Sequence, residues 1–233
     1  MPYLRGFVYE IEAAAHPSPE TAAALVLTSD DWNEHMLSVG AVLVVRQGSR
    51  SHLPAFGVVP LYALGLDAVP GHIVSLEHEH LGSKPLYRIE DEELRAVERA
   101  LSEVLGLPDV LSAVPRRPYT PGGPTRYPLW GQVYYGPGRP ERKRYLVVSA
   151  NPWNRSADRV LTIRLTTSAR RVGTEFPHVR GGRACCAELT ALRSARFTPR
   201  ERVAPDLTKA EMVAIARGLV ETHRLEGALG GSG

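Results

Sequence analysis

The sequence is poor in cysteine. Its 233 residues include two cysteines, Cys185 and Cys186, which are neighbours in the chain. Adjacent cysteines rarely bridge each other, and the sequence offers no other thiol, so we expect a reducing, cytoplasmic setting. Two cysteines are also too few for the usual structural zinc sites, even beside His78 and His80. The sequence therefore predicts no metal and no cofactor.

The sequence also lacks a long hydrophobic run. No stretch approaches the roughly 20 apolar residues that a membrane-spanning helix needs. Its first residues, MPYLRGFVYEIEAAAH, do not place a basic region before an apolar one, which argues against a secretory signal. With 43% hydrophobic and 23% charged residues, the chain has the composition of a globular protein with a buried core. We expect no membrane partner.

Charge is distributed very unevenly along the chain. Residues 1–112 contain 7 Lys and Arg against 16 Asp and Glu, a net charge of −9. Residues 113–233 contain 21 against 9, a net charge of +12, which together give the +3 of the whole chain. The second half is therefore the half suited to polyanions such as RNA. The same split would also arise if two oppositely charged domains dock on each other.

The first half predicts several short strands followed by one helix. Strands are expected at 4–11, 24–29, 40–46 and 72–76, with a turn at 30–33. Apolar residues at helical spacing and an acidic first turn predict a helix over 91–105, and Gly106 is expected to end it. Residues 109–127 are rich in Pro and Gly, which indicates a linker between domains.

The order of elements is repeated after this linker. The segment LWGQVYY at 129–135 matches LRGFVYE at 4–10, and LVVS at 146–149 matches LVLT at 25–28. Trp153-Asn154 repeats Trp32-Asn33 at the same spacing. Gly182 to Leu192 is aligned with Gly71 to Leu81, which sets Glu188 opposite Glu77. A second helix is expected at 208–221, opening with the capping-box spacing of Thr208 and Glu211.

The second repeat contains WGQV at 130–133, RYLVVS at 144–149, Asn154-Arg155 and LTIRLTTS at 161–168. In these segments it resembles the MazF/PemK toxin family of endoribonucleases, which is related to the gyrase-poisoning CcdB toxins. It implies a mainly β fold with helices, an α+β class in which two tandem SH3-like small barrels are each closed by a C-terminal helix. The chain differs from the family pattern at Gln132, usually acidic, and at Lys143-Arg144, usually Arg-Pro.

The resemblance also implies an activity, the metal-independent cleavage of single-stranded RNA by attack of a ribose 2′-hydroxyl on its own phosphate. Cationic donors must then face the phosphate oxygens, with a hydroxyl that helps to hold them. Arg144 or Lys143 matches the first role, and Thr167 with Ser168 matches the second. Lys143, set among arginines, is also a candidate general base. The expected RNA-binding residues are Arg142, Asn154, Arg155, Arg164 and Thr166.

Each of these features also has a structural explanation. A basic triplet before a strand can protect a sheet edge, and a Thr-rich strand end fits ordinary β-structure. Trp32 and Trp153 are expected to be core residues rather than platforms for bases. His178 could carry a proton.

The domains are expected at 1–108 for a degenerate acidic barrel, 109–127 for the linker, 128–226 for a basic barrel and 227–233 for a flexible tail. Because Ala22, Ala23 and Ala24 stand where the basic cluster is expected, the first barrel should be inactive. The two barrels would form an internal pseudo-dimer, so that the chain could act as a monomer.

Two functions remain open from the sequence. One is a toxin-like endoribonuclease. The other is a non-catalytic module that binds RNA or a protein partner, with the acidic half covering the basic half. An antitoxin is a candidate partner in either case, and nothing in the sequence argues for or against gyrase as a target.

Overall fold

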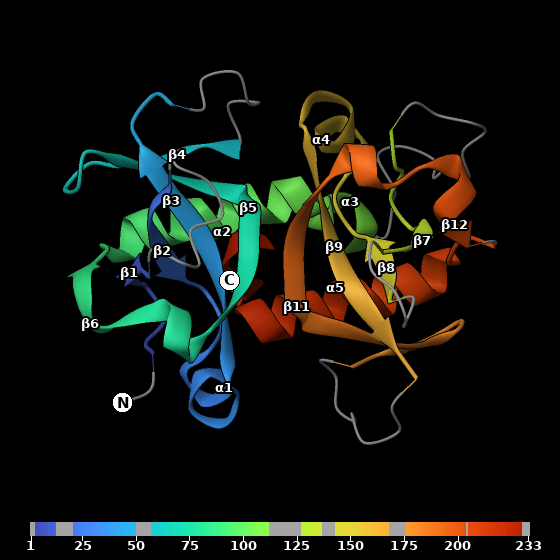
Figure 1. Ribbon diagram of the computed structural model, residues 1–233, viewed down its shortest axis with the longest axis horizontal. Helices are drawn as coiled ribbons and strands as arrows, with labels where there is room; N and C mark the ends of the chain where they lie inside the picture. The colour runs from blue at the N-terminus through green and yellow to red at the C-terminus, as the bar shows by residue number, and fades with distance from the viewer. Residues whose placement is uncertain are drawn as a thin grey trace.

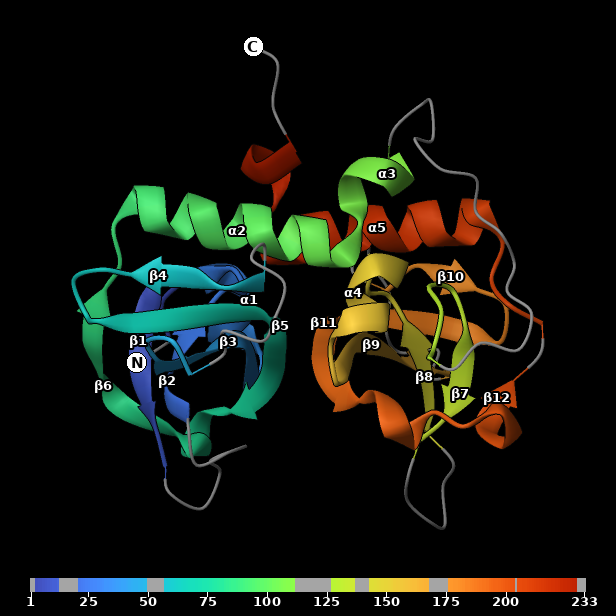
Figure 2. The same ribbon diagram turned by 90° about the horizontal axis from the view of Figure 1, so that it is seen from above.

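The computed structural model describes residues 3–12, 21–49, 57–111, 127–136, 143–167, 176–203 and 205–229. In these ranges the chain has a mixed α+β fold, which confirms the predicted class, with two six-stranded antiparallel sheets. The sheets lie side by side (Figure 1), and the long helices α2 (Asp91–Leu105) and α5 (Lys209–His223) run along the same side of them (Figure 2). No helix in these ranges is long and apolar enough to cross a bilayer.

The first sheet is built from the acidic half of the chain. Its strands are arranged in the order β4-β5-β3-β2-β1-β6. They are β1 (Phe7–Ile11), β2 (Thr21–Val26), β3 (Ser38–Arg46), β4 (Val59–Leu61), β5 (Leu66–Glu77) and β6 (Leu81–Arg88). The Trp32-Asn33 segment, predicted as a turn, is a short helix, α1 (Asp30–His35), and a single turn of 3₁₀-helix, η3 (His78–His80), joins β5 to β6.

The second sheet is built from the basic half, and its order is β10-β11-β9-β8-β7-β12. The strands are β7 (Val133–Tyr135), β8 (Arg144–Val147), β9 (Arg159–Thr166), β10 (His178–Val179), β11 (Gly182–Arg193) and β12 (Arg202–Val203). The helical segments between them are α4 (Asn151–Ser156), η4 (Ser194–Arg196) and η5 (Pro199–Glu201).

The two sheets share one strand order and one pairing register. Ala23 lies opposite Val44 in the first sheet, and Arg144 lies opposite Leu165 in the second. Each residue of the second pair therefore stands 121 positions after its counterpart in the first pair. The neighbouring pairs of β2 with β3 and of β8 with β9 recur at the same spacing. A position in one sheet can therefore be compared directly with its counterpart in the other.

The predicted alignment of β5 with β11 is wrong by five residues. Ala68 pairs with Val44 in the first sheet, whereas Ala184 pairs with Leu165 in the second. Since Val44 and Leu165 are counterparts, so are Ala68 and Ala184, which makes Glu188 the counterpart of His72 rather than of Glu77. Glycine-to-glycine matching misled the sequence comparison, because Gly71 and Gly182 occupy different positions in their strands.

Helix α2 begins and ends where its sequence predicts, and α5 begins as predicted but extends to His223, two residues beyond the predicted end. Gly106 caps α2 in the left-handed conformation, at φ 66°, which glycine adopts without steric cost. Thr208 and Glu211 form the predicted capping box at the start of α5, each accepting a hydrogen bond from the backbone N–H of the other.

Short helical segments lie near the predicted domain ends. Helix α3 (Leu107–Leu111) continues directly after Gly106 and packs against α5, so the first residues of the predicted linker are helical. Residues 112–126 lie outside the described part of the chain. Glu226–Leu229 form a 3₁₀-helix, η6, beside α2, in the segment predicted as a flexible tail.

The two sheets meet through a continuous apolar core. One cluster of buried residues runs through both halves, and β5 packs beside β11 at the junction. Trp153 is fully buried there, with its indole against the α-carbons of Gly57 and Gly71 from the first half. Trp32 is only partly buried and lies 6.3 Å from the ring of Phe176 in the second half. Trp153 is a core residue, as predicted, whereas Trp32 is only partly buried, and each tryptophan contacts the other half of the chain.

Candidate functional site

Four predicted site residues come together where β8 begins and β9 ends. Arg144 is the first residue of β8, Lys143 precedes it, Thr166 is the last residue of β9 and Thr167 follows it. We refer to Lys143, Arg144, Thr166 and Thr167 as the strand-end site. Lys143 and Thr167 are exposed, while Arg144 and Thr166 are half-buried. The other two expected residues of this segment, Arg142 and Ser168, lie outside the described residues.

Arg144 and Thr167 lie on the same side of the sheet. Arg144 is directly opposite Leu165, and residues two apart in a strand point to the same face, so Thr167 is its diagonal neighbour. Such diagonal positions are about 7–8 Å apart, within reach of an arginine side chain. The predicted pairing of a guanidinium with a threonine hydroxyl is therefore compatible with the register.

A tight hairpin borders the guanidinium of Arg144. β10 and β11 are joined through Arg180 and Gly181, and β11 starts at Gly182. A Cβ atom placed on Gly181 would lie 2.7 Å from Nη1 of Arg144. One placed on Gly182 would lie 2.4 Å from the carbonyl oxygen of Thr166 and 3.7 Å from Nη2 of Arg144. The two glycines thus allow the hairpin, the arginine and the end of β9 to approach closely.

The start of α5 holds this hairpin. The carboxylate of Glu211 accepts a hydrogen bond of 2.5 Å from the backbone N–H of Arg180 and one of 2.7 Å from the backbone N–H of Thr208. Burial favours the neutral acid, but the hydrogen bonds from Thr208 and Arg180 outweigh it and lower the pKa of Glu211. A charged carboxylate therefore ties the hairpin to the helix at neutral pH.

A row of polar side chains crosses the opposite face of the sheet from Arg144, beginning at Thr166. Thr166 pairs with Arg183 on β11, and Arg183 pairs with His178 on β10. His178 is exposed, and Arg183 is half-buried with Nη1 3.5 Å from the carbonyl oxygen of Phe176. Arg183 was not among the residues predicted from sequence. The register of β9 with β11 identifies it, and that register was not available from the sequence.

The corresponding positions of the first sheet have a different chemistry. The counterpart of Arg144 is Ala23, and the row reads Val45, Asp67 and Pro60 in place of Thr166, Arg183 and His178. Ala23, Val45 and Asp67 are buried, and the Asp67 carboxylate accepts a 2.8 Å hydrogen bond from the N–H of Gly48. The first sheet therefore presents no cationic side chain along this row.

Arg164 already has an acidic partner. Its Nε and Nη2 lie 2.8 Å from the two carboxylate oxygens of Glu188 on β11, and each side chain is 27% exposed. This ion pair, with one hydrogen bond from Nη2, offsets much of the charge that a phosphate would meet. Arg164 was predicted to bind RNA, and the structure places its guanidinium on a carboxylate.

Asn154 was also predicted to bind RNA, and it is buried. Its amide donates a 2.9 Å hydrogen bond to the carbonyl oxygen of Ser149, and its side-chain oxygen accepts one from the Ser149 hydroxyl. Asn33 repeats this arrangement with Thr28, at 3.1 Å for the amide and 2.6 Å for the hydroxyl. The asparagines of both Trp-Asn segments therefore stabilise the turn into a short helix.

Arg155 is exposed but belongs to the other end of the sheet. Its Nε donates a 3.2 Å hydrogen bond to the hydroxyl of Tyr127. Helix α4 precedes β9, and Thr166 ends that strand (Figure 1). The eight residues of β9 span about 23 Å. The structure thus separates Arg155 from the strand-end site.

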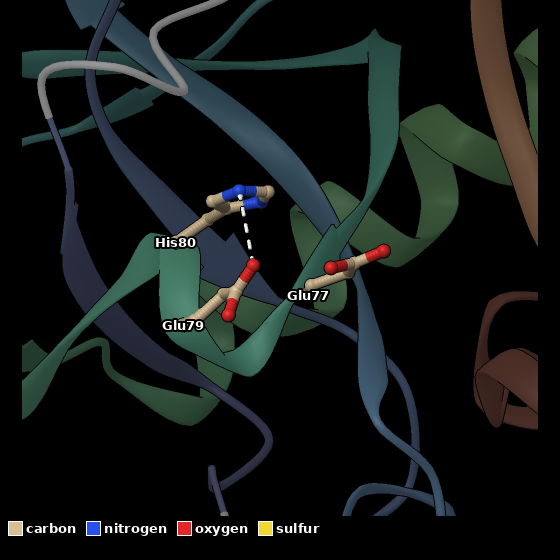
Figure 3. Close-up of side chains that lie close together, drawn as sticks. All are labelled: Glu77, Glu79 and His80. Carbon is tan, nitrogen blue, oxygen red and sulfur yellow. Dashed lines mark ion pairs between the residues drawn. The ribbon is translucent and has the colours of Figure 1, made fainter.

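A separate group of possible metal ligands lies between β5 and β6 in the first half. Glu77, Glu79 and His80 place one ligand atom each within 4.8 Å of one another (Figure 3). Nε2 of His80 is 3.8 Å from Oε1 of Glu79, and both carboxylates are exposed. His78 points elsewhere, with its ring 4.9 Å from that of Tyr3, and burial lowers its pKa. Solvated carboxylates at such separations are common without an ion, and we assign no metal site here.

Comparison with known proteins gives partial structural matches. No protein-family model and no curated protein sequence matches this chain. One solved structure, an endoribonuclease in complex with its cognate antitoxin from a mycobacterial species, is 27% identical, with a TM-score of 0.37. The match covers 41% of this chain and 93% of that one. A second endoribonuclease from a mycobacterial species is 26% identical, covering 42% of this chain and 91% of its own, with a TM-score of 0.36.

Proposed function

We propose that this protein is a toxin-like endoribonuclease that cleaves single-stranded RNA at the strand-end site. One observation carries the proposal, the contrast between counterpart positions of two sheets with the same register. The second sheet has Arg144, Arg183 and His178 where the first has Ala23, Asp67 and Pro60. The two sheets have the same strand register, so the fold alone does not require different side chains at these positions. Binding of a phosphodiester would require the cationic side chains of the second sheet.

The proposed reaction is an internal transfer at phosphorus. The 2′-hydroxyl loses its proton and its oxygen bonds to the adjacent phosphorus, while the bond from phosphorus to the 5′-oxygen breaks and that oxygen takes up a proton. The products are a 2′,3′-cyclic phosphate and a free 5′-hydroxyl. Negative charge grows on the non-bridging oxygens, where a fixed guanidinium stabilises it. Arg144 has this role, because an arginine stays protonated and can donate two parallel hydrogen bonds.

The remaining residues of the strand-end site have supporting roles in this proposal. The Thr167 hydroxyl, on the same face as Arg144, donates to a phosphate oxygen. The amine of Lys143 is the candidate acceptor of the 2′-hydroxyl proton, and Ser168, outside the described residues, remains part of the proposal. Arg183 and His178 form a second cationic row on the opposite face of the sheet, which adjacent nucleotides reach around the end of β9.

We further propose that the two halves are tandem barrels of the MazF/PemK type, packed as an internal pseudo-dimer. The shared strand order, the 121-residue recurrence of the β2–β3 pairings and the reciprocal contacts of Trp32 and Trp153 support this interpretation. In such an arrangement the first half lost its catalytic side chains and kept its packing. The pairing of Arg164 with Glu188 and the burial of Asn154 remove these two from the proposed RNA contacts.

The proposal is tested by incubating the purified chain with mixed single-stranded RNA in EDTA. We expect cleavage that leaves 5′-hydroxyl ends, at least about 100-fold slower in Arg144→Ala, by analogy with the loss of one oxyanion donor. Thr167→Ala should also be slower. Arg193→Ala is the matched control, because this exposed arginine lies at the far end of β11. Equal rates for Arg144→Ala and Arg193→Ala would remove Arg144 from the mechanism.

The second candidate function is a module that binds RNA or an antitoxin-like protein without cutting. The ion pair of Arg164 with Glu188 favours it, because it withdraws one cation from the basic surface. In this reading acidic α1, whose Trp32 contacts Phe176, would compete with the ligand. Because the halves share a core, deleting residues 1–108 would expose apolar surface, so Asp31→Asn is the cleaner test. Tight salt-dependent binding that Asp31→Asn strengthens, without cleavage by any variant, would support the module.

A further inference from the structure

We infer that the β10–β11 hairpin positions Arg144 for catalysis, and that Gly181 and Gly182 are required for this purpose. The inference rests on the proposed function, because it concerns the residue that would contact the phosphate. It adds positioning residues that do not themselves touch RNA.

The first argument is steric. A methyl group on Gly181 would come within 2.7 Å of Nη1 of Arg144, closer than carbon and nitrogen atoms pack. The guanidinium or the hairpin would then have to move. The side chain of Arg144 thus occupies the space that the absent Cβ of Gly181 leaves.

The second argument compares the β4–β5 hairpin of the first half, whose turn has the four residues 62–65 where the β10–β11 turn has two. Gly65 is the counterpart of Gly181, and both have positive φ, 62° and 88°. A Cβ on Gly65 meets no atom within 4 Å. Gly65 is therefore a glycine of positive φ in open space, whereas Gly181 is crowded by an arginine whose counterpart in the first half is Ala23.

The third argument concerns the next residue. The counterpart of Gly182 is Leu66, which pairs with Arg46 at the start of β5. The longer turn of the first half accommodates this leucine, whereas the two-residue turn brings the start of β11 against the end of β9. Gly182 instead has φ 148°, and a Cβ on it would overlap the carbonyl oxygen of Thr166 at 2.4 Å and approach Nη2 of Arg144. The glycine is needed in the half that carries Arg144, and the first half has Ala23 in that place.

The fourth argument is the anchoring of the hairpin. Arg180 donates its N–H to Glu211, which is itself fixed by Thr208 at the start of α5. On the other side, the N–H of Ala184 donates a 3.0 Å hydrogen bond to the carbonyl oxygen of Pro177. The hairpin is thus held by α5 and by the pairing of β10 with β11. This fixed backbone restricts the positions that the Arg144 side chain can take.

The test compares Gly181→Ala with Gly65→Ala in the full chain. Both substitutions place an alanine at positive φ, so both should cost similar stability, and thermal unfolding measures this. Only Gly181→Ala should displace Arg144. A displacement of about 1 Å can cost about 100-fold in rate, so we expect kcat for RNA cleavage to fall about 10- to 100-fold with KM little changed. Gly65→Ala should cleave like the unmodified chain.

A second readout does not depend on cleavage. The Nε–Hε signal of Arg144 in an NMR spectrum, assigned with Arg144→Lys, should shift in Gly181→Ala and stay in place in Gly65→Ala. Glu211→Gln, which keeps the shape but weakens the anchor, should broaden or shift the same signal. If Gly181→Ala is too unstable to study, Glu211→Gln tests the inference in its place.

The outcomes separate this inference from the proposed function. An unmoved Arg144 signal in both Gly181→Ala and Glu211→Gln, or normal kcat in Gly181→Ala while Arg144→Ala is inactive, would overturn the positioning role. A chain that cleaves no RNA while the Arg144 signal shifts in Gly181→Ala would refute the nuclease and retain the positioning of Arg144.

Discussion

The indole of Trp153 lies directly against the α-carbon of Gly71 on the other sheet. A Cβ atom on Gly71 would fall 1.9 Å from Cζ2 of the tryptophan, which leaves no room for any side chain. The contact joins the half that carries Arg144 to the half that has Ala23 in its place. The second half therefore needs the first half to bury this indole.

Gly71→Ala should therefore destabilise the whole chain. Overpacking of a closed core typically costs about 1–3 kcal/mol, and this overlap is with a fully buried ring. Urea unfolding measures the loss. Gly227→Ala is the control, because a Cβ there meets nothing within 4 Å. Two separate unfolding transitions in the unmodified chain would contradict the shared core.

Arg183→Gln should weaken RNA binding without removing catalysis. If Arg183 contacts one phosphate, the slope of log K against log salt for single-stranded RNA should decrease by about 0.7. KM should rise and kcat should change little. Arg193→Gln removes the same charge from the far end of β11 and should leave both the slope and KM unchanged. An identical slope in the two variants would exclude Arg183 from the RNA path.

Asn154→Ala should lower stability rather than RNA affinity. The substitution removes the hydrogen bonds that the buried Ser149 hydroxyl and carbonyl make with Asn154, although the hydroxyl still accepts one from the Leu161 N–H, and the loss costs about 1–3 kcal/mol. Asn33→Ala removes the matching contacts with Thr28 and should cost a similar amount. Urea unfolding and RNA titration of the folded variants separate the two effects. A large loss of RNA affinity in Asn154→Ala alone would restore its predicted binding role.

Stability should decrease in mild acid because of His223. This side chain is fully buried on α5, and burial, with the charge of Arg5, lowers its pKa to about 4, although the carbonyl oxygen of Cys186 works in the other direction. The unfolded chain, with an ordinary pKa near 6.5, binds the proton more readily between pH 4 and 6.5. The free energy of unfolding should therefore fall as pH drops through this window, by about 3 kcal/mol in total.

His223→Gln is the comparison for this pH effect. Urea unfolding at several pH values between 7 and 4 should show a steeper decline for the unmodified chain than for the variant. Parallel declines would mean that other groups cause the acid sensitivity.

Much of the helix and strand order follows from the sequence, because it depends on local patterns. The helical spacing and acidic start of 91–105 predict both ends of α2, and the Thr208–Glu211 capping box predicts the start of α5, without reference to the rest of the chain. The repeated Trp-Asn segments were also visible as sequence. The buried hydrogen bonds of their asparagines could not be predicted, because the sequence around an asparagine in a turn does not indicate whether its side chain is exposed or buried.

The contacts that define the strand-end site depend on register, which the sequence did not determine. Glycines at 71 and 182 suggested an alignment that is five residues off, so Arg183 was not placed beside Thr166. The ion pair of Arg164 with Glu188 was missed for the same reason, since the two residues are brought together by the pairing of β9 and β11. The close contact of Gly181 with the Arg144 side chain could not be predicted either, because it exists only in the folded hairpin.

The most direct test of the proposed function compares RNA with 2′-O-methyl RNA of the same sequence, in EDTA, using the unmodified chain and Arg144→Ala. If the reaction is attack by the 2′-hydroxyl with Arg144 stabilising the phosphate, the unmodified chain should bind both polymers, cut only the RNA and leave 5′-hydroxyl ends. Arg144→Ala should cut neither. Binding of both polymers with cleavage of neither by the unmodified chain would contradict the nuclease and leave a binding module.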